Sequence, residues 1–226
     1  MPRVVLEVAA FDPASAVAAA AAGADRVELC RDADAGGLTP PLAWVRRVTA
    51  AVPVPVVAMV RSHADGWTFT DREHAAMRAD ARALVDAGAA GVVWGALRPD
   101  GSLDGDALAA LVAAVRPHPV TVHRAVDHAR DLGTALVVAR EAGARRVLTS
   151  GGAPTAWEGV ERLAALVGAA GDRLSVMPGG GVRAGTVAEI VRRTGAHEVH
   201  SGASAPGQRV VDPAEVRRLR AAIDAR

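Results

Sequence analysis

Three residue types are missing from this chain: its 226 residues include no lysine, no asparagine and no tyrosine. All 26 basic side chains other than histidine are therefore arginine. Without lysine, no Schiff base can form between the protein and a carbonyl substrate or pyridoxal phosphate. The composition thus excludes lysine-dependent aldolases and pyridoxal enzymes.

Cysteine is almost absent as well, because Cys30 is the only one. One cysteine permits neither an intrachain disulfide nor a Cys-x-x-Cys metal site, which suits a reducing compartment. No apolar run reaches the roughly 18 to 20 residues that a membrane span needs. The N-terminal "MPRVVLEVAAFDP" also lacks the basic and apolar regions of a signal peptide. We therefore expect a cytoplasmic protein that does not contact a membrane.

Neither sign of charge is in excess, since 26 basic residues face 25 acidic ones for a formal net charge of +1. Charges balanced in this way create no field that would recruit nucleic acid, so we expect a small-molecule partner. A chain of this length, half of it apolar, is near the size of one α/β barrel. No linker divides it, and we predict a single domain over residues 1–226.

Short apolar runs alternate with Ala-, Leu- and Arg-rich stretches of helical period, eight of each. Several of the helical stretches open with Asp or Pro, as at Asp12-Pro13 and Asp212-Pro213. The predicted strands are Val4 to Val8, Arg26 to Cys30, Val56 to Arg61, Gly91 to Gly95, Pro119 to Arg124, Arg145 to Ser150, Arg173 to Pro178 and Glu198 to Ser201.

An internal repeat supports this count. The second, fourth, sixth and eighth strands lie in "GADRVELC", "GAAGVVWG", "GARRVLTS" and "GAHEVHSG", each with Gly-Ala at a predicted helix end. A βαβα unit that occurs four times closes most simply into a (β/α)8 TIM barrel, whereas an open sheet gives no reason for four equivalent quarters. We predict the α/β barrel.

Polar residues in the predicted strands fall on the face that points into the barrel. Successive strand residues alternate between the interior and the helices, and barrel active sites form at the strand C-termini. Because Val27 and Leu29 suit the helix-facing side, their neighbours turn inward. The eighth strand adds Glu198 and His200 on the inner face if Val199 faces outward. The candidate catalytic residues are Glu7, Glu28, Arg61 and His123.

Two interpretations of these four residues remain open. Two carboxylates, an arginine and a histidine at one open end would suit proton transfer or the binding of a polar ligand. Alternatively, they form a buried ion-pair network that fills the barrel, since a charge in the interior needs a partner whatever its function.

Glycine-rich loops follow the seventh and eighth strands, as "MPGGGVRAGT" and "SGAS". These are the positions where barrels often hold a phosphate on bare backbone N–H groups. With no lysine present, Arg183 would supply the charge, although the glycines also suit a simple tight turn. The predicted ligand-binding residues are Ser150, Gly151, Gly179, Gly180, Gly181, Arg183, Ser201 and Gly202. The long loop "RSHADGWTFTD" adds Trp67 and Phe69, either as a lid or as a contact with a second subunit.

Several blocks together resemble the copper homeostasis protein CutC family. They are "GADRVELC", "GGLTP", "AMVR", "LRPDG", "PVTVHRAVD", "RRVLTSGGAP" and "MPGGGVR", in unbroken order from about residue 4 to residue 204. The resemblance implies a cytosolic (β/α)8 barrel, usually oligomeric, with a role in copper handling through Cu(I) binding. A homo-oligomer, most simply a dimer, is expected on the same basis.

The copper site implied by the resemblance relies on paired cysteines, whereas Cys30 stands alone here. Cu(I) prefers thiolate and thioether donors, so Met59 or Met177 would have to complete a site at Cys30, with His123 as a nitrogen donor. Two hypotheses follow. The chain is a copper-homeostasis protein that binds Cu(I) at Cys30, or it is an enzyme, without Schiff-base chemistry, that acts on a small phosphorylated or carboxylated metabolite at the barrel mouth.

Overall fold

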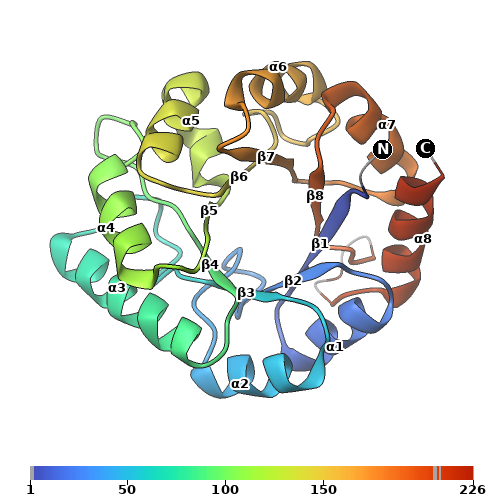
Figure 1. The fold of residues 1–226 in the computed structure, drawn as a ribbon, viewed down its shortest axis with the longest axis horizontal. Helices are drawn as coiled ribbons and strands as arrows, with labels where there is room; N and C mark the ends of the chain where they lie inside the picture. The colour runs from blue at the N-terminus through green and yellow to red at the C-terminus, as the bar shows by residue number, and fades with distance from the viewer. Residues whose placement is uncertain (1–2, 206–207, 209, 226) are drawn as a thin grey trace.

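Eight parallel strands form a ring with helices outside it, in a computed structural model that describes residues 3–205, 208 and 210–225 (Figure 1). The predicted (β/α)8 TIM barrel is confirmed. The strands are β1 Val5–Ala10, β2 Arg26–Leu29, β3 Val56–Met59, β4 Gly91–Trp94, β5 Val120–Val122, β6 Arg146–Thr149, β7 Ser175–Pro178 and β8 Glu198–Ser201. Backbone ladders join them in the order β7-β6-β5-β4-β3-β2-β1-β8.

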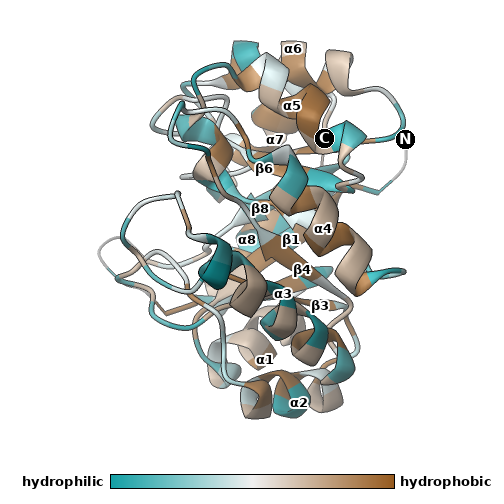
Figure 2. Ribbon diagram, turned by 90° about the vertical axis from the view of Figure 1, so that its left-hand side faces the viewer, coloured by the Kyte–Doolittle hydropathy of each residue, from teal (hydrophilic) through white to brown (hydrophobic). Residues whose placement is uncertain are grey.

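The helices that follow the strands cover the outside of the ring (Figure 1). Figure 2 shows hydrophobic and hydrophilic residues alternating around outer helices such as α2 and α3, as expected where one side faces the barrel. The bounds are α1 Pro13–Ala21, α2 Leu42–Ala51, α3 Asp71–Asp86, α4 Gly105–Val115, α5 Leu132–Glu141, α6 Val160–Ala170, α7 Ala184–Thr194 and α8 Pro213–Asp224, with a 3₁₀ helix η1 at Arg124–His128.

The Gly-Ala repeat marks four helix ends. Its glycines, at positions 23, 88, 143 and 195, have φ between +69° and +111°, which side chains with a Cβ rarely adopt. The helix starts also follow the sequence, since Asp12, Asp104 and Asp212 each cap a helix through a side-chain oxygen. The helix α3 begins at Asp71 and is capped by the side chain of Thr70, which accepts from the backbone N–H of Glu73.

Side chains on the two faces of the strands form separate clusters. The helix-facing cluster contains Leu6, Val27 and Leu29, while Cys30, Val57, Met59 and Val93 form a small cluster inside the barrel. Five predicted strands end early in the structure: β2 stops at Leu29, β3 at Met59, β4 at Trp94, β5 at Val122 and β6 at Thr149. Arg61 and His123 therefore lie just past the strand ends, where the backbone leaves the ladder.

Candidate active site

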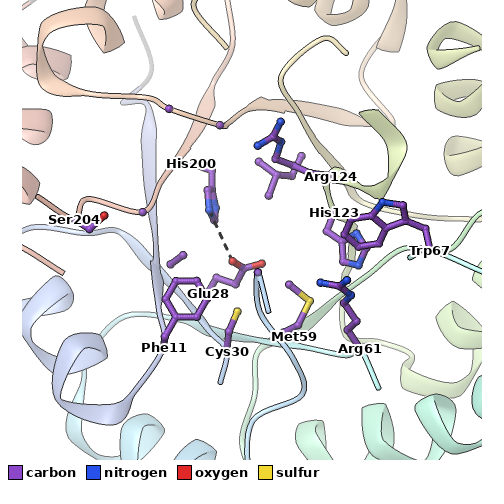
Figure 3. Close-up of a pocket in the computed structure, with 16 residues that line it drawn as sticks. Phe11, Glu28, Cys30, Met59, Arg61, Trp67, His123, Arg124, His200 and Ser204 are labelled. Atoms are coloured by element: carbon purple, nitrogen blue, oxygen red, sulfur yellow. Dashed lines mark ion pairs between the residues drawn. The ribbon is translucent and has the colours of Figure 1, made fainter. Parts of the chain in front are cut away.

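The C-terminal ends of the strands surround a pocket of about 260 Å³, shown in Figure 3. This is below the usual range for drug-sized ligands, so the pocket suits a small metabolite. Its polar lining comes from strands β2 and β8 and from the segments after β3, β5 and β8: Glu28, Arg61, His123, Arg124, His200 and Ser204. The rest of the lining is apolar or small: Ala9, Phe11, Cys30, Gly36, Met59, Trp67, Leu148, Gly180, Gly181 and Gly202.

His200 lies between two carboxyl groups. Its Nδ1 is 2.8 Å from Glu7 Oε1, and its Nε2 is 3.8 Å from Glu28 Oε2. The contact with Glu7 follows from register, because β1 pairs Glu7 with His200 of β8. Glu7 thereby fixes the ring orientation of His200, whose Nε2 faces the pocket side.

The surroundings of these three groups move their pKa values apart. Burial would raise the pKa of Glu7, but its hydrogen bond with His200 and the charge of Arg26 lower it to about 2. Burial raises the pKa of Glu28 to about 7, although the positive charge of His200 opposes the shift. Burial would lower the pKa of His200, yet the hydrogen bond with Glu7 and the charge of Glu28 raise it. Carboxyl groups tuned in opposite directions are typical of acid–base sites.

Glu7 itself does not line the pocket and belongs to a network of buried charges beneath it. The Arg26 guanidinium donates to Glu7 and, at 2.5 Å, to Glu198 Oε2. Arg146 Nε also donates to Glu198 Oε2, at 2.6 Å. The expectation that Glu7 shares one rim with the other three candidates is therefore wrong. The side chain of Glu7 points into the barrel, as the alternation along the strand predicts. The stagger of β1 against β2 and β8, however, places it one layer deeper than the pocket.

Arg61 is a buried cation that forms no ion pair within the described residues, although the charge of Asp65 acts on it from nearby. Its Nη1 donates to the carbonyl of Ala35 at 2.9 Å and its Nη2 to that of Ala64 at 3.2 Å. Its Nε is buried and has no hydrogen-bond partner, and no carboxylate within the described residues forms an ion pair with it. The guanidinium carbon lies 4.2 Å from the centre of the Trp67 ring. A buried charge that the protein leaves uncompensated is a candidate for binding an anion.

His123 is held as a neutral imidazole. Its Nδ1 accepts the backbone N–H of Ala125 at 3.2 Å, so the single ring proton of the neutral form sits on Nε2. Burial, together with the charge of Arg61, lowers the pKa of His123 to about 3. The Nε2 atom is buried and has no hydrogen-bond partner within the described residues. The Trp67 ring packs over both His123 and Arg61, which supports the lid interpretation of this loop (Figure 3).

An arginine from another segment of the chain packs against the glycine loop after β7. Arg124, at the start of η1, lies against Gly180, where a Cβ would come within 2.8 Å of its Nη1. Its Nε donates to Asp127 Oδ2 at 2.8 Å and its Nη2 to Ser150 Oγ at 3.1 Å. Only Nη1 of the guanidinium has no hydrogen bond to the described residues. This nitrogen could donate a charge-assisted hydrogen bond to an anionic ligand at the glycine loop.

Five of the predicted ligand-binding residues do not line the pocket. Arg183 donates instead to the carbonyl of Ser204, because it caps α7 and points along the loop after β8. Ser201 Oγ donates to the carbonyl of Val182 and ties the two glycine loops together. Gly179 packs too closely against Leu148 and His200 for any Cβ. Ser150 and Gly151 are buried in the loop that Asp127 organises. Gly180, Gly181 and Gly202 do line the pocket.

A family model described as the CutC family matches residues 4–205. The chain belongs to the CutC family. It is 42% identical to a CutC family protein of Sinorhizobium medicae over all of this chain and 98% of the relative. It is 45% identical to one of Caulobacter vibrioides, with 90% of this chain and 83% of the relative aligned.

Solved structures agree with this family assignment. The crystal structure of CutC from Streptococcus agalactiae, named as a copper homeostasis protein, has a TM-score of 0.83 and 25% identity, and the match covers 88% of this chain and 98% of that one. Thiamine phosphate pyrophosphorylase from Pyrococcus furiosus has a TM-score of 0.66 at 14% identity, over 98% of this chain and 96% of that one. The second likeness shows the barrel fold alone.

For copper, which the CutC name suggests, this pocket offers two sulfur-containing side chains, but one of them is a thiol that burial keeps from ionising. Cys30 and Met59 lie on either side of Gly37, where a Cβ would be 3.3 Å from Cys30 Sγ and 3.5 Å from Met59 Cε. Cu(I) would need the thiolate, but burial and the charge of Glu28 raise the pKa of Cys30. Over the described part of the chain, no group of three His, Cys, Asp or Glu side chains could hold a metal ion.

Two ionisable pocket residues of this CutC chain, Arg124 and His200, are not among the site residues that the sequence predicts. The alternation turns His200 inward, but it does not indicate how deep in the barrel the side chain lies. Arg124 follows His123 directly, so alternation would turn it towards the helices; η1 begins at this residue and redirects it. The signal for both lies in the sequence, in "VHSG" and "HRAVD", but not in strand periodicity.

Proposed function

We propose that this CutC-family protein is an enzyme that binds a small phosphorylated or carboxylated metabolite at the barrel mouth and moves protons with Glu28 and His200. One observation carries the proposal. Of the five buried side-chain atoms without a hydrogen-bond partner in the described residues, three belong to pocket residues: Glu28 Oε1, Arg61 Nε and His123 Nε2. Buried polar atoms are normally satisfied, so three around one pocket imply a ligand that satisfies them.

The proposed roles follow from position and charge. Glu28 has a pKa of about 7, so its carboxylate is available as a base near neutral pH. His200, oriented by Glu7, supplies a second proton-transfer group within 3.8 Å of Glu28. Arg61 and Arg124 offer positive charge on other sides of the pocket, where an anionic ligand would bind.

A thermal-shift titration with inorganic phosphate, sulfate and succinate tests anion binding. We expect at least one of them to raise the melting temperature, because a ligand that binds only the folded state stabilises it. The substitution Arg124→Met removes one charge-assisted contact and should weaken that binding about tenfold or more. Arg192→Met, at an exposed surface ion pair, is the matched control. No stabilisation by any of these anions, or equal stabilisation of wild type and Arg124→Met, would contradict the proposal.

Membership of the CutC family supports a role in copper homeostasis, and Cu(I) binding at Cys30 is a second candidate. The proximity of the Cys30 and Met59 side chains in Figure 3 favours it, since both sulfur atoms are donors that Cu(I) accepts.

Competition with a Cu(I) chelator under reducing conditions tests the copper candidate. If Cys30 is the anchor, Cys30→Ser and Met59→Leu should each lose affinity relative to wild type. Equal and weak uptake by all three proteins would exclude a copper site at Cys30. The anion titration is independent of this outcome, so the two functions can be separated.

A further inference from the structure

We propose, on the basis of the enzyme function above, that the substrate is a small phosphorylated carbonyl compound and that the reaction begins with proton removal from the carbon beside the carbonyl. In this arrangement His123 and Arg61 bind the carbonyl oxygen, Glu28 takes the proton, and Arg124 with the glycine loops holds the phosphate. The inference names the substrate class and assigns His123 a role as an electrophile rather than a base.

The role of His123 follows from its tautomer. A ring whose Nδ1 accepts a backbone N–H can only donate from Nε2, and that atom has no acceptor within the described residues. His123 is also only 4% exposed and lines the pocket, so bulk water has little access to its ring. A neutral imidazole that donates one hydrogen bond in a buried pocket polarises a carbonyl and stabilises the enolate oxygen. It cannot be the base, because its only free nitrogen already carries the proton.

Arg61 reinforces the same end of the pocket. Its guanidinium and the His123 ring lie next to each other beneath Trp67 in Figure 3, and Arg61 is also 4% exposed. Burial lowers the pKa of Arg61, although the charge of Asp65 opposes this shift. Because Nε of Arg61 has no hydrogen-bond partner within the described residues, the guanidinium can still bind an anionic group. Negative charge that develops on an oxygen during the reaction would be stabilised more strongly here than in water.

Glu28 is placed to accept the proton. Its Oε1 has no hydrogen-bond partner in the described part of the chain, while its Oε2 faces His200. The C–H bond of the substrate breaks and its proton moves to Oε1. The C–H electron pair forms the new C=C bond, and the carbonyl π electrons move to the oxygen held by His123 and Arg61. Return of the proton to the same carbon gives exchange. Where that carbon bears a hydroxyl group, transfer of the hydroxyl proton to the enolate oxygen, followed by return of the first proton to the former carbonyl carbon, gives isomerisation, so no co-reactant is needed.

The phosphate position follows from the loops. The N–H groups of Gly180 and Gly181 have no acceptor within the described residues, and Arg124 lies directly against Gly180. Gly202 and Ser204 line the pocket from the neighbouring loop after β8. Backbone N–H groups together with one arginine favour a phosphate group over a neutral one.

The test compares phosphoglycolohydroxamate, which resembles a phosphorylated enediolate, with glycerol 3-phosphate, which has the phosphate but no planar enolate-like group. We expect calorimetry to show that wild type binds the hydroxamate at least tenfold more tightly, since enzymes bind mimics of the reacting state better than ground-state analogues. His123→Ala should lose most of this preference while binding glycerol 3-phosphate as wild type does. His123→Gln, which keeps a donor, should recover part of it.

Each outcome has one meaning. If both compounds bind equally to wild type, or if His123→Ala keeps the full preference, the inference on His123 and the carbonyl is wrong although the proposed enzyme function stands. If neither compound binds and the anion titration is also negative, the proposed function itself fails. Unchanged binding of glycerol 3-phosphate shows that His123→Ala is folded.

Discussion

Glu28 is the residue at which function and stability oppose each other most directly. Its carboxyl group has an ordinary pKa of 4.5 and a pKa of about 7 in the folded protein, because burial disfavours the ionised form. The folded state therefore gains from this group below pH 4.5, and the gain is lost as the pH rises through about 7. Above that range, the buried carboxylate costs on the order of 3 kcal/mol relative to the unfolded chain.

This cost predicts a pH-dependent effect of Glu28→Gln. We expect the variant to raise the free energy of unfolding by on the order of 2–3 kcal/mol at about pH 8.5 and to change it much less at about pH 4.5. Urea denaturation at the two pH values measures both quantities. Glu141→Gln, on an exposed part of α5, is the control and should have little effect at either pH. Equal effects of Glu28→Gln at both pH values would show that its carboxyl group is not perturbed.

At the scale of elements, the strands and helices could be predicted because their signals are local and occur four times. The Gly-Ala helix ends and the Asp caps each depend on a few neighbouring residues. For the candidate site, the sequence indicates which side chains point into the barrel but not how deep they lie. Glu28 and Glu7 both face inward, yet one lines the pocket and the other lies beneath it, because depth depends on the stagger between strands. The position of Arg124 in the pocket depends on η1, a short helix that strand periodicity does not indicate.

The hydrogen bonds of Asp127, which lies in the short helix η1, lead to a further prediction at this scale. Its carboxylate accepts hydrogen bonds from the backbone of Ser150 and Gly152 and from Arg124, so it joins η1 to the loop after β6. An amide has one acceptor oxygen, and Asp127→Asn would place an N–H₂ group against buried donors. We expect a loss of about 1–3 kcal/mol in the free energy of unfolding.

Because Asp127 also orients Arg124, Asp127→Asn should weaken binding of the stabilising anion. Urea denaturation and the thermal-shift titration measure the two effects. Asp106→Asn removes a carboxylate that is 95% exposed and paired with Arg98, and it should change neither quantity noticeably. If Asp127→Asn lowers stability but leaves anion affinity unchanged, Arg124 is not part of the anion site.

At the scale of the whole molecule, buried charges help to hold the barrel together across its interior. No backbone ladder joins β7 to β8 within the described residues, although the other neighbouring strands are paired. Arg26 of β2 bridges Glu7 of β1 and Glu198 of β8, and Arg146 of β6 also reaches Glu198. The network therefore connects strands on both sides of this seam and also supports His200 from below. Its loss should affect the fold and the site together.

Arg26→Met tests this connection, because methionine fills similar space without the charge. It leaves Glu7 and Glu198 buried with fewer partners, and we expect a loss of about 3–5 kcal/mol near pH 7. The pKa of Glu7 is lowered to about 2, so its contribution is full above its ordinary value of 4.5 and disappears as the pH falls through about 2. The deficit of the variant should thus shrink at about pH 3. Urea denaturation at both pH values measures it, with Arg192→Met as the exposed control. A deficit that is the same at both pH values would mean that Arg26 contributes through packing, and that the charges beneath the pocket do not stabilise the barrel.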